Sequence, residues 1–569
     1  MARERGLYIS RRDFLKLSGA GLAGATLLGV AGCGGGETVG GGQSGGGGGG
    51  ESTFTYGRGA DSVSLDPINA TDGESFIVTR QVFDGLLDFE PGTTNVVPAL
   101  ATEIPEPEDG GRVYILNLRE GVTFHDGESL NAEAVVFNFD RWRLTDNEYH
   151  TGGGNQSSDF AYYSLMFGGF DDDSFIENVE AVDEQTVRFT LTEPLGPFLR
   201  NLAMSPFGIA SPAAIQDNVE EFWQNPIGSG PFTFESWNRG SEVRLSANNE
   251  WWGTDLPASE GGGGPNVDRV VIRSIPDNTA RVAALNGGEL SGADGLTPDD
   301  VPSLEENEEL QVISRPPLNI AYLAMNCQKA PFDDARVRRA MTHAINVEEI
   351  VQAFFVDTGQ VASNAMPPTV PYFREATQPY EYNPDEARRL LQEAGMGDGF
   401  DMDLWYMPIP RPYMPDGRGV AQAMQRDLEE VGINARLVTR EWGTYLEETG
   451  TGAHDAAMLG WSGDNGDPDN FLNVLLSSAS ATEEDAQNIA YYKNPELDDI
   501  LRQGATTIDE AERRRLYEQA QEIIYNDAPW VPIEYAEVPL GYQANVEGIV
   551  PNPTGGESFN AAEFTGGGA

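Results

Sequence analysis

A strand, a helix and two further strands follow one another in the second half of the chain, and this succession constrains the fold most. Apolar residues alternate over 400–406, which predicts a strand, and recur at helical spacing over 420–431, where Gly432 ends the helix. Alternating apolar residues predict a further strand over 433–437, and a short apolar run predicts another over 456–459. Because a helix that links neighbouring strands is the unit of a parallel sheet, the series predicts an α/β fold.

A glycine-rich loop, 459–471, follows the last of these strands. It reads Leu-Gly-Trp-Ser-Gly-Asp-Asn-Gly-Asp-Pro-Asp-Asn-Phe. In open α/β sheets, ligands bind in the crevice beyond the carboxyl ends of the strands. Glycines let the backbone approach a ligand, Trp461 offers a flat apolar wall, and Asp464 offers a negative charge. The loop suits a small ligand with a positive end, although the same residue types are also typical of an ordinary surface turn.

A second loop, 409–413, follows the strand expected over 400–406. Two prolines restrict its backbone around Arg411. Arg411 and Asp464 therefore both follow strand ends in one α/β unit, and they face one crevice if those strands end at the same edge of the sheet. The alternative is that both are exposed charges, or pair with each other, which contributes little to stability.

The chain is strongly acidic, with 36 lysines and arginines against 90 aspartates and glutamates and a formal net charge of −54 over 569 residues. This charge repels polyphosphate, so we expect no binding of nucleic acid. Concentrated salt screens such self-repulsion, and we infer a halophilic source. The length predicts two or more domains. Outside the N-terminal segment the one cysteine is Cys327, which we expect to be a buried small hydrophobe without a disulfide partner.

Residues 1–33 have the features of an export signal. A twin-arginine motif over 10–16 precedes a modest apolar run over 17–31. The segment ends in Val-Ala-Gly-Cys33, which resembles the lipobox of secreted lipoproteins, and 34–50 is a glycine-rich tether. We expect export by the twin-arginine route and an extracytoplasmic body anchored to the outer face of the cell membrane through lipidated Cys33. A plain signal peptide with an incidental cysteine is the alternative.

Several long motifs spread along the rest of the chain resemble one family. They are the block 114–141, the segment Asn-Pro-Ile-Gly-Ser-Gly-Pro-Phe over 225–232, the pair Trp251-Trp252, and the segment Pro-Phe-Asp-Asp-Ala-Arg-Val-Arg-Arg-Ala over 331–340. This set resembles the family 5 extracellular solute-binding proteins of ABC importers. The loop over 460–471 is most similar to that of the bacterial dipeptide-binding proteins.

The resemblance implies a two-lobed α/β fold of the type 2 periplasmic-binding-protein class, with a hinge and a larger first lobe that contains an extra subdomain. The first lobe would comprise 51–317 and 535–569, and the second 318–534, with crossovers near 318–322 and 531–535. The partners implied are a short peptide ligand and the permease subunits of an ABC transporter in the membrane. We expect a monomer without a cofactor.

By the same resemblance, Asp464 binds the α-ammonium group of a dipeptide and Arg411 binds its α-carboxylate. An extended dipeptide spans about 7 Å, a distance that two neighbouring loops can bridge. Arginine suits the carboxylate because its planar fork forms two parallel hydrogen bonds. Further ligand contacts are implied for Gly460, Trp461, Tyr413, Thr71 and Gly73. Closure of the lobes about the hinge would then bury the ligand.

Other functions remain open from the sequence. A secreted hydrolase is one alternative, but no HExxH zinc motif or Walker loop is present, and we expect neither a catalytic residue nor a metal site. A calcium-binding module is another, because Asp467 and Asp469 follow Asp464 closely, although the spacing is not that of an EF-hand. Within the family, longer peptides, nickel or haem are the alternative ligands.

Overall fold

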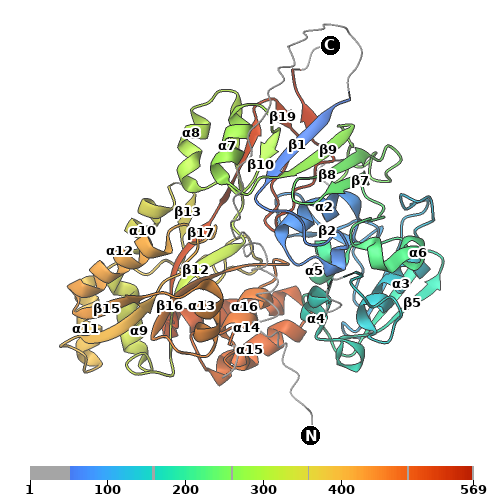
Figure 1. Ribbon diagram of the computed structural model, residues 1–569. Coiled ribbons are helices and arrows are strands. Elements are labelled where there is room, and N and C mark those ends of the chain that lie inside the picture. Colours follow the sequence, from blue (N-terminus) through green and yellow to red (C-terminus); the bar gives the residue numbers. More distant parts are fainter. Residues whose placement is uncertain are drawn as a thin grey trace.

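The structure, a computed structural model, describes residues 51–154, 156, 160–257, 261–356, 358–482 and 486–566. The predicted export signal, Cys33 and the glycine tether lie outside the described residues. Most of the described strands form two large mixed sheets, one of seven strands and one of six, in separate parts of the molecule (Figure 1).

The seven-stranded sheet draws its strands from both ends of the described chain. Its order is β11-β18-β10-β1-β9-β8-β7, in which β1 runs parallel to its neighbours β9 and β10. These strands are β1 (Thr53–Arg58), β7 (Phe232–Asn238), β8 (Glu242–Ala247), β9 (Arg269–Ser274), β10 (Gly292–Ala293), β11 (Leu310–Arg315) and β18 (Val538–Gln543). The same part of the molecule contains helices α2 (Gly73–Val82), α6 (Pro212–Phe222), α7 (Asn278–Asn286) and α8 (Val301–Glu305), and the short strands β2 (Leu87–Phe89), β3 (Val96–Pro98), β19 (Val546–Glu547) and β20 (Glu563–Phe564).

A smaller three-stranded sheet forms a subdomain beside this lobe. It has the order β4-β6-β5 and packs with three helices around a hydrophobic core of its own. The elements are β4 (Val113–Asn117), β5 (Ile176–Asp183), β6 (Thr186–Leu191), α3 (Ala132–Arg143), α4 (Ala161–Phe167) and α5 (Phe198–Leu202). The family-like block 114–141 therefore supplies one strand and most of one helix of the subdomain. Asn131 begins that helix as its cap, because its side chain accepts a hydrogen bond from the Ala134 N–H at 3.0 Å.

The six-stranded sheet forms the second lobe, with the order β13-β17-β12-β16-β14-β15. Its strands are β12 (Asn319–Met325), β13 (Gly359–Val361), β14 (Phe400–Trp405), β15 (Ile433–Val438), β16 (Ala456–Ser462) and β17 (Trp530–Ala536). The helices of this lobe are α9 (Ala335–Ala344), α10 (Val347–Phe354), α11 (Pro384–Glu393), α12 (Gly417–Glu430), α13 (Trp442–Gly450), α14 (Asp469–Leu476), α15 (Pro495–Thr506) and α16 (Glu510–Asp527). The predicted strand–helix–strand series is confirmed as β14, α12 and β15, with Gly432 in the left-handed region (φ +88°) after the helix.

Strand β16 continues farther than the apolar run over 456–459 indicates. It ends at Ser462 because its antiparallel pairing with β12 extends through Ile320 opposite Trp461 and Asn319 opposite Ser462. Gly460 and Trp461 therefore lie within the strand. The loop itself is shorter than predicted, since α14 begins at Asp469.

The chain passes between the two large sheets twice. It leaves the first sheet after Arg315 and enters the second at Asn319, and it returns between Ala536 and Val538. The two passages lie side by side, because β11 pairs with β18 in one sheet and β12 pairs with β17 in the other. This connectivity gives the two-lobed α/β fold that the family resemblance implies.

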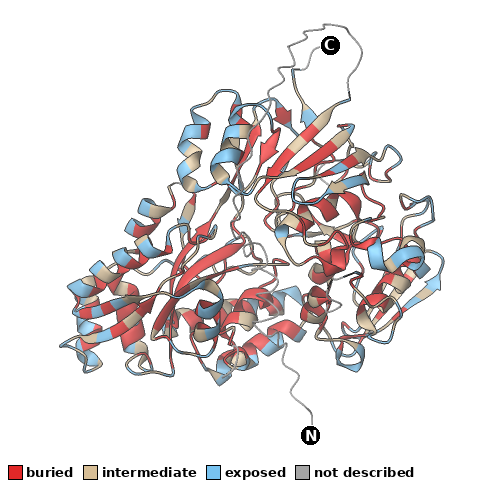
Figure 2. Cartoon of the chain, in the orientation of Figure 1, coloured by how far each residue is buried: buried red, intermediate tan, exposed pale blue. Residues whose placement is uncertain are grey.

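Buried residues follow the strands of both sheets, and exposed residues lie on the outer faces of the helices (Figure 2). Cys327 is buried, and burial raises the pKa of its thiol to about 11, which confirms its predicted place in the core. Among the described residues, no helix combines the length and the apolar character needed to cross a membrane.

Candidate functional site

The two predicted charged residues leave neighbouring strands of the second lobe at the same edge. Strand β14 runs parallel to its neighbour β16, so their carboxyl ends point in the same direction. Arg411 follows β14 and Asp464 follows β16. Both residues therefore follow strands that end at the same edge of the sheet, which is the condition for Arg411 and Asp464 to face one crevice.

The loop that carries Arg411 packs directly against β16. A Cβ atom at Gly460 would lie 2.2 Å from Cδ2 of Tyr413 and 2.6 Å from the carbonyl oxygen of Ile320, so only glycine fits there. Tyr413 is buried in this contact. The close approach of ring and strand fixes the position of the Arg411 loop relative to the Asp464 loop.

The backbone of Arg411 is held in a tight turn. Its N–H donates to the carbonyl oxygen of Met414 at 3.0 Å, and the Met414 N–H donates back at 2.9 Å. The guanidinium carbon lies 5.2 Å from the ring centre of Trp442. The side chain is partly exposed, and within the described part of the chain it forms no ion pair, either with Asp464 or with another carboxylate. The alternative in which Arg411 and Asp464 neutralise each other is therefore not observed.

Asp464 is a partly buried carboxylate with a hydrogen bond on each oxygen. The Tyr162 hydroxyl donates to Oδ1 at 3.1 Å, and the Asn470 amide donates to Oδ2 at 3.0 Å. The backbone N–H of Asp464 in turn donates to Oδ1 of Asn470 at 3.0 Å, which fixes the loop. Burial raises the pKa of Asp464 to about 6, although both hydrogen bonds favour the ionised form.

No cation neutralises Asp464: within the described ranges, no arginine, lysine or histidine lies within ion-pair distance of its carboxylate. The hydrogen bonds use only part of the acceptor capacity of the two oxygens. The arrangement is chemically suited to a ligand that brings a positive charge and hydrogen-bond donors.

The start of helix α2 in the first lobe lies beside Tyr162, because Phe76 of α2 packs edge-on against the Tyr162 ring at 5.7 Å. Asp72 caps the helix, because its side chain accepts a hydrogen bond from the Ser75 N–H at 2.9 Å. Thr71 is partly exposed and Gly73 is exposed, with no atom within 4 Å of the place where a Cβ would stand. After burial and the charge of Asp464, the charge of Asp72 at the start of the helix also raises the pKa of Tyr162.

Trp461 and Tyr413 lie mainly in the core of the second lobe. Trp461 is 5% exposed, and its indole N–H donates to Oδ1 of Asn470 at 3.3 Å. Through Asn470, this tryptophan supports the loop that holds Asp464. A direct contact of either aromatic ring with a ligand stays a prediction.

Asp467 has a structural role that the sequence does not reveal. It is fully buried, and Arg513 of α16 donates to both of its oxygens, at 3.0 and 2.9 Å. Burial favours the neutral acid, but the charge and hydrogen bonds of Arg513, together with the charge of Arg200 and the Asp469 N–H, outweigh it and lower the pKa of Asp467. Asp467 therefore anchors the loop to α16 as well as forming its turn.

Sequence reasoning missed Tyr162 and Asn470 as partners of Asp464. Asn470 is six positions away in a run of turn-forming residues, so its side chain carried no distinct signal. Tyr162 is 302 positions away in the other lobe. Its hydroxyl meets the carboxylate because the two lobes are in contact at this point.

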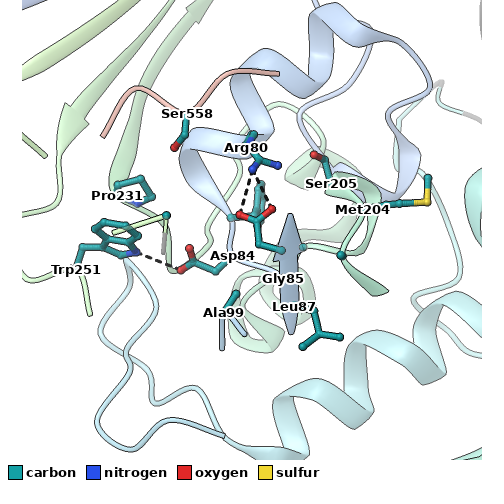
Figure 3. Close-up of a pocket in the computed structure, with 15 residues that line it drawn as sticks. Arg80, Asp84, Gly85, Leu87, Ala99, Met204, Ser205, Pro231, Trp251 and Ser558 are labelled. Atoms are coloured by element: carbon teal, nitrogen blue, oxygen red, sulfur yellow. Dashed lines mark hydrogen bonds and ion pairs between the residues drawn. The ribbon is translucent and has the colours of Figure 1, made fainter. Parts of the chain in front are cut away.

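A small cavity of about 50 Å³ lies elsewhere, in the first lobe (Figure 3). Neither Arg411 nor Asp464 lines it. Its wall includes Asp84, whose Oδ2 accepts hydrogen bonds from Trp252 at 2.7 Å, Ser229 at 2.8 Å and Trp251 at 3.4 Å. The paired tryptophans of the family-like sequence thus hold a carboxylate inside the first lobe.

Comparison with known proteins agrees with the fold and with the motifs. Residues 95–483 match the profile of the bacterial extracellular solute-binding proteins, family 5. The dipeptide-binding protein of Escherichia coli is 35% identical over 519 residues, which cover 89% of this chain and 94% of that protein. Heme-binding protein A of Haemophilus influenzae is 32% identical over 528 residues, or 90% of this chain and 93% of that protein.

The solved structure of HbpA2 from Haemophilus parasuis has the same fold, with a TM-score of 0.82 at 31% identity, over 90% of this chain and 100% of that chain. Together, the profile match, the relatives and the shared fold cover nearly all of the described residues. The chain therefore belongs to the family 5 extracellular solute-binding proteins, the ligand-capturing components of ABC importers.

Proposed function

We propose that this protein captures dipeptides, or comparably short peptides, and presents them to the permease subunits of an ABC importer. Asp464 binds the α-ammonium group and Arg411 binds the α-carboxylate. One observation carries the proposal. Among the described residues, the partly buried carboxylate of Asp464 has no cationic partner, and Arg411, at the same edge of the sheet, has no carboxylate partner.

The two ends of a zwitterionic peptide satisfy both loops at once. Each charged group that enters a closed site must be paired, because burying an unpaired charge in a protein interior costs roughly several kcal/mol. Two extended residues span about 7 Å, so the separation of the two charges selects for ligand length. Thr71, Gly73, Gly460, Trp461 and Tyr413 then form the walls around the peptide.

Chemically blocked ligands test this assignment directly. Calorimetry of dialanine, N-acetyl-dialanine and dialanine amide is expected to show strong binding only for the free dipeptide. In Arg411→Ala, amidation of the ligand is expected to cost little further affinity, since the partner of the carboxylate is already gone. Tripeptides, longer peptides, Ni²⁺ and haemin are the comparison ligands. If haemin or a long peptide binds and dipeptides do not, the short-peptide assignment is wrong.

Binding is expected to follow a bell-shaped pH profile. The pKa of Asp464 is raised to about 6, and a ligand ammonium group lowers it, so affinity is full above that value and is lost as the pH falls through it. On the alkaline side, the α-ammonium group of the ligand loses its proton at about pH 8, and affinity falls again. Calorimetric titrations with dialanine between about pH 4.5 and 9.5, a range that includes both pKa values, measure this profile. A flat acid limb contradicts a role for Asp464.

We further propose that the protein reaches the outer face of the membrane through the twin-arginine route and is anchored there by Cys33. The support is the motif over 10–16, the lipobox-like ending and the tether over 34–50. In Cys33→Ser, the protein is expected to move from the membrane fraction to the soluble extracytoplasmic fraction, while dipeptide affinity is unchanged. Mass spectrometry of the mature N-terminus measures the lipid, and an unmodified Cys33 contradicts the anchor.

A further inference from the structure

One loop of the second lobe touches the first lobe at consecutive positions. Asp464 accepts a hydrogen bond from Tyr162, and the next residue, Asn465, donates to Oδ1 of Asn201 at 2.7 Å. Asp467 lies 3.8 Å from Nε of Arg200. The segment that carries the ammonium-binding carboxylate is therefore also a contact surface between the lobes.

The loop fits closely against the first lobe between these polar contacts. Gly466 has a φ of +65°, and a Cβ atom there would stand 2.5 Å from Cβ of Thr94. A residue with a side chain would push the lobes apart at this point. The loop geometry thus favours close approach of the two lobes.

Tyr162 occupies a defined position on the first-lobe side. It lies in α4, is 9% exposed, and packs edge-on against Phe76 of α2 at a ring distance of 5.7 Å. Burial first, and then the charges of Asp464 and Asp72, raise the pKa of its hydroxyl, so the group stays protonated and acts as a donor. The titratable group that faces the Asp464 carboxylate is accordingly Tyr162 from α4, and Asn470 from α14 adds an uncharged donor; the charge of Asp72, at the start of α2, acts on Tyr162.

We propose that Tyr162 is a positioning residue that couples closure of the lobes to recognition of the ligand ammonium group. Its hydroxyl holds Oδ1 of Asp464 from the first lobe, while Asn470 holds Oδ2 from the second. The inference rests on the proposed function of Asp464, and it adds a residue from the opposite lobe to that site.

The coupling follows from the location of the two hydrogen bonds. The Asn470 bond is internal to one lobe and persists when the lobes separate, whereas the Tyr162 bond requires both lobes to meet. Because the hydroxyl favours the ionised carboxylate, it offsets part of the burial that raises the pKa of Asp464. If the bond across the lobes strengthens binding of the ammonium group, a bound ammonium group promotes closure by the same factor. Ligands with a blocked amine lose this reciprocal gain, so closure itself selects for a free α-ammonium group.

Tyr162→Phe tests the inference, because it removes one oxygen atom and keeps the ring that packs on Phe76. Dialanine affinity at pH 7 is expected to fall by about 10-fold or more, since the bond lost is one to a charged group. The acid limb of the pH profile is expected to move to higher pH, because Asp464 loses a hydrogen bond that favours its ionised form. Small-angle scattering with saturating dialanine is expected to show a larger open fraction than in the unmodified protein.

The neighbouring Tyr163→Phe is the matched control. Tyr163 is fully buried in the same helix, and its hydroxyl meets only Ser174 of the first lobe, at 2.9 Å, among the hydrogen bonds of the described residues. Its variant is expected to keep both the affinity and the pH profile. If Tyr162→Phe weakens binding but leaves the acid limb where it is, or if both variants behave alike, the positioning role is overturned. The proposed function is judged separately by Asp464→Ala: loss of binding there with an unaffected Tyr162→Phe overturns the coupling alone.

Discussion

Asp464→Ala is expected to abolish practical dipeptide capture, with a loss in affinity of roughly 30- to 3,000-fold. Removal of one partner from an enclosed, hydrogen-bonded charge pair costs about 2–5 kcal/mol, because the remaining charge is left without a partner. In this case the ligand ammonium group would enter a closed site without its carboxylate. Isothermal calorimetry with dialanine at pH 7, where Asp464 is ionised in the unmodified protein, measures the loss.

Asp385→Ala supplies the control for this experiment. It removes one negative charge from a side chain that is 95% exposed on α11, in the same lobe. Since exposed charges are screened by solvent and salt, this variant is expected to bind dialanine normally. If Asp464→Ala binds dialanine as tightly as the unmodified protein, the assignment of Asp464 is wrong. If both variants lose affinity to the same extent, the cause is the overall charge of the protein.

Asp467→Asn is expected to lower the free energy of unfolding by about 3–5 kcal/mol. The substitution keeps the shape of the side chain but leaves Arg513, which is 5% exposed, without its carboxylate. An uncompensated guanidinium group in a protein interior is the reason for the large effect. Denaturant unfolding monitored by tryptophan fluorescence measures it, and the transition midpoint is expected to fall without a change in slope.

The exposed ion pair between Asp385 and Arg388 gives the comparison for stability. Their side chains are 95% and 48% exposed, and Asp385→Asn is expected to change the free energy of unfolding by less than about 1 kcal/mol. Both variants replace one aspartate by asparagine, but Asp467 is the buried partner of Arg513 at 2.9 Å and of Arg200 at 3.8 Å, whereas Asp385 has one exposed partner. A fall of less than about 1 kcal/mol for Asp467→Asn would show that the buried pair contributes no more than a surface pair.

The local part of the fold was predictable from sequence, because it depends on residues close together in the chain. Alternating apolar residues gave β14, helical spacing gave α12, and Gly432 marked the end of the helix. The order of these elements was also enough to place Arg411 and Asp464 after strands. Their common edge required the parallel pairing of β14 with β16, which the sequence pattern suggests but does not determine.

The contacts between distant segments were not predictable in the same way. Asp467 stands in a run of glycine, asparagine, aspartate and proline, where its turn-forming character hides its ion pair with Arg513. Tyr162 sits in an ordinary aromatic helix, and nothing in its neighbourhood indicates a partner in the other lobe. The end of β16 at Ser462 was equally hidden, because pairing with β12 extends the strand beyond its apolar residues.

The paired passages between the sheets have a consequence for engineering. Asn319 is the first residue of the second sheet along the chain, and Ala536 is the last. The side-chain amide of Asn319 nevertheless donates to the Ala536 carbonyl oxygen at 2.7 Å and accepts from the Ala536 N–H at 2.8 Å. A segment whose two ends meet in this way can be moved as one cassette, since its insertion requires no change in the spacing of the acceptor chain. Exchange of residues 319–536 between relatives would therefore transplant Arg411 and Asp464 together, and with them the ligand preference that we propose, while the recipient keeps its own Tyr162 counterpart.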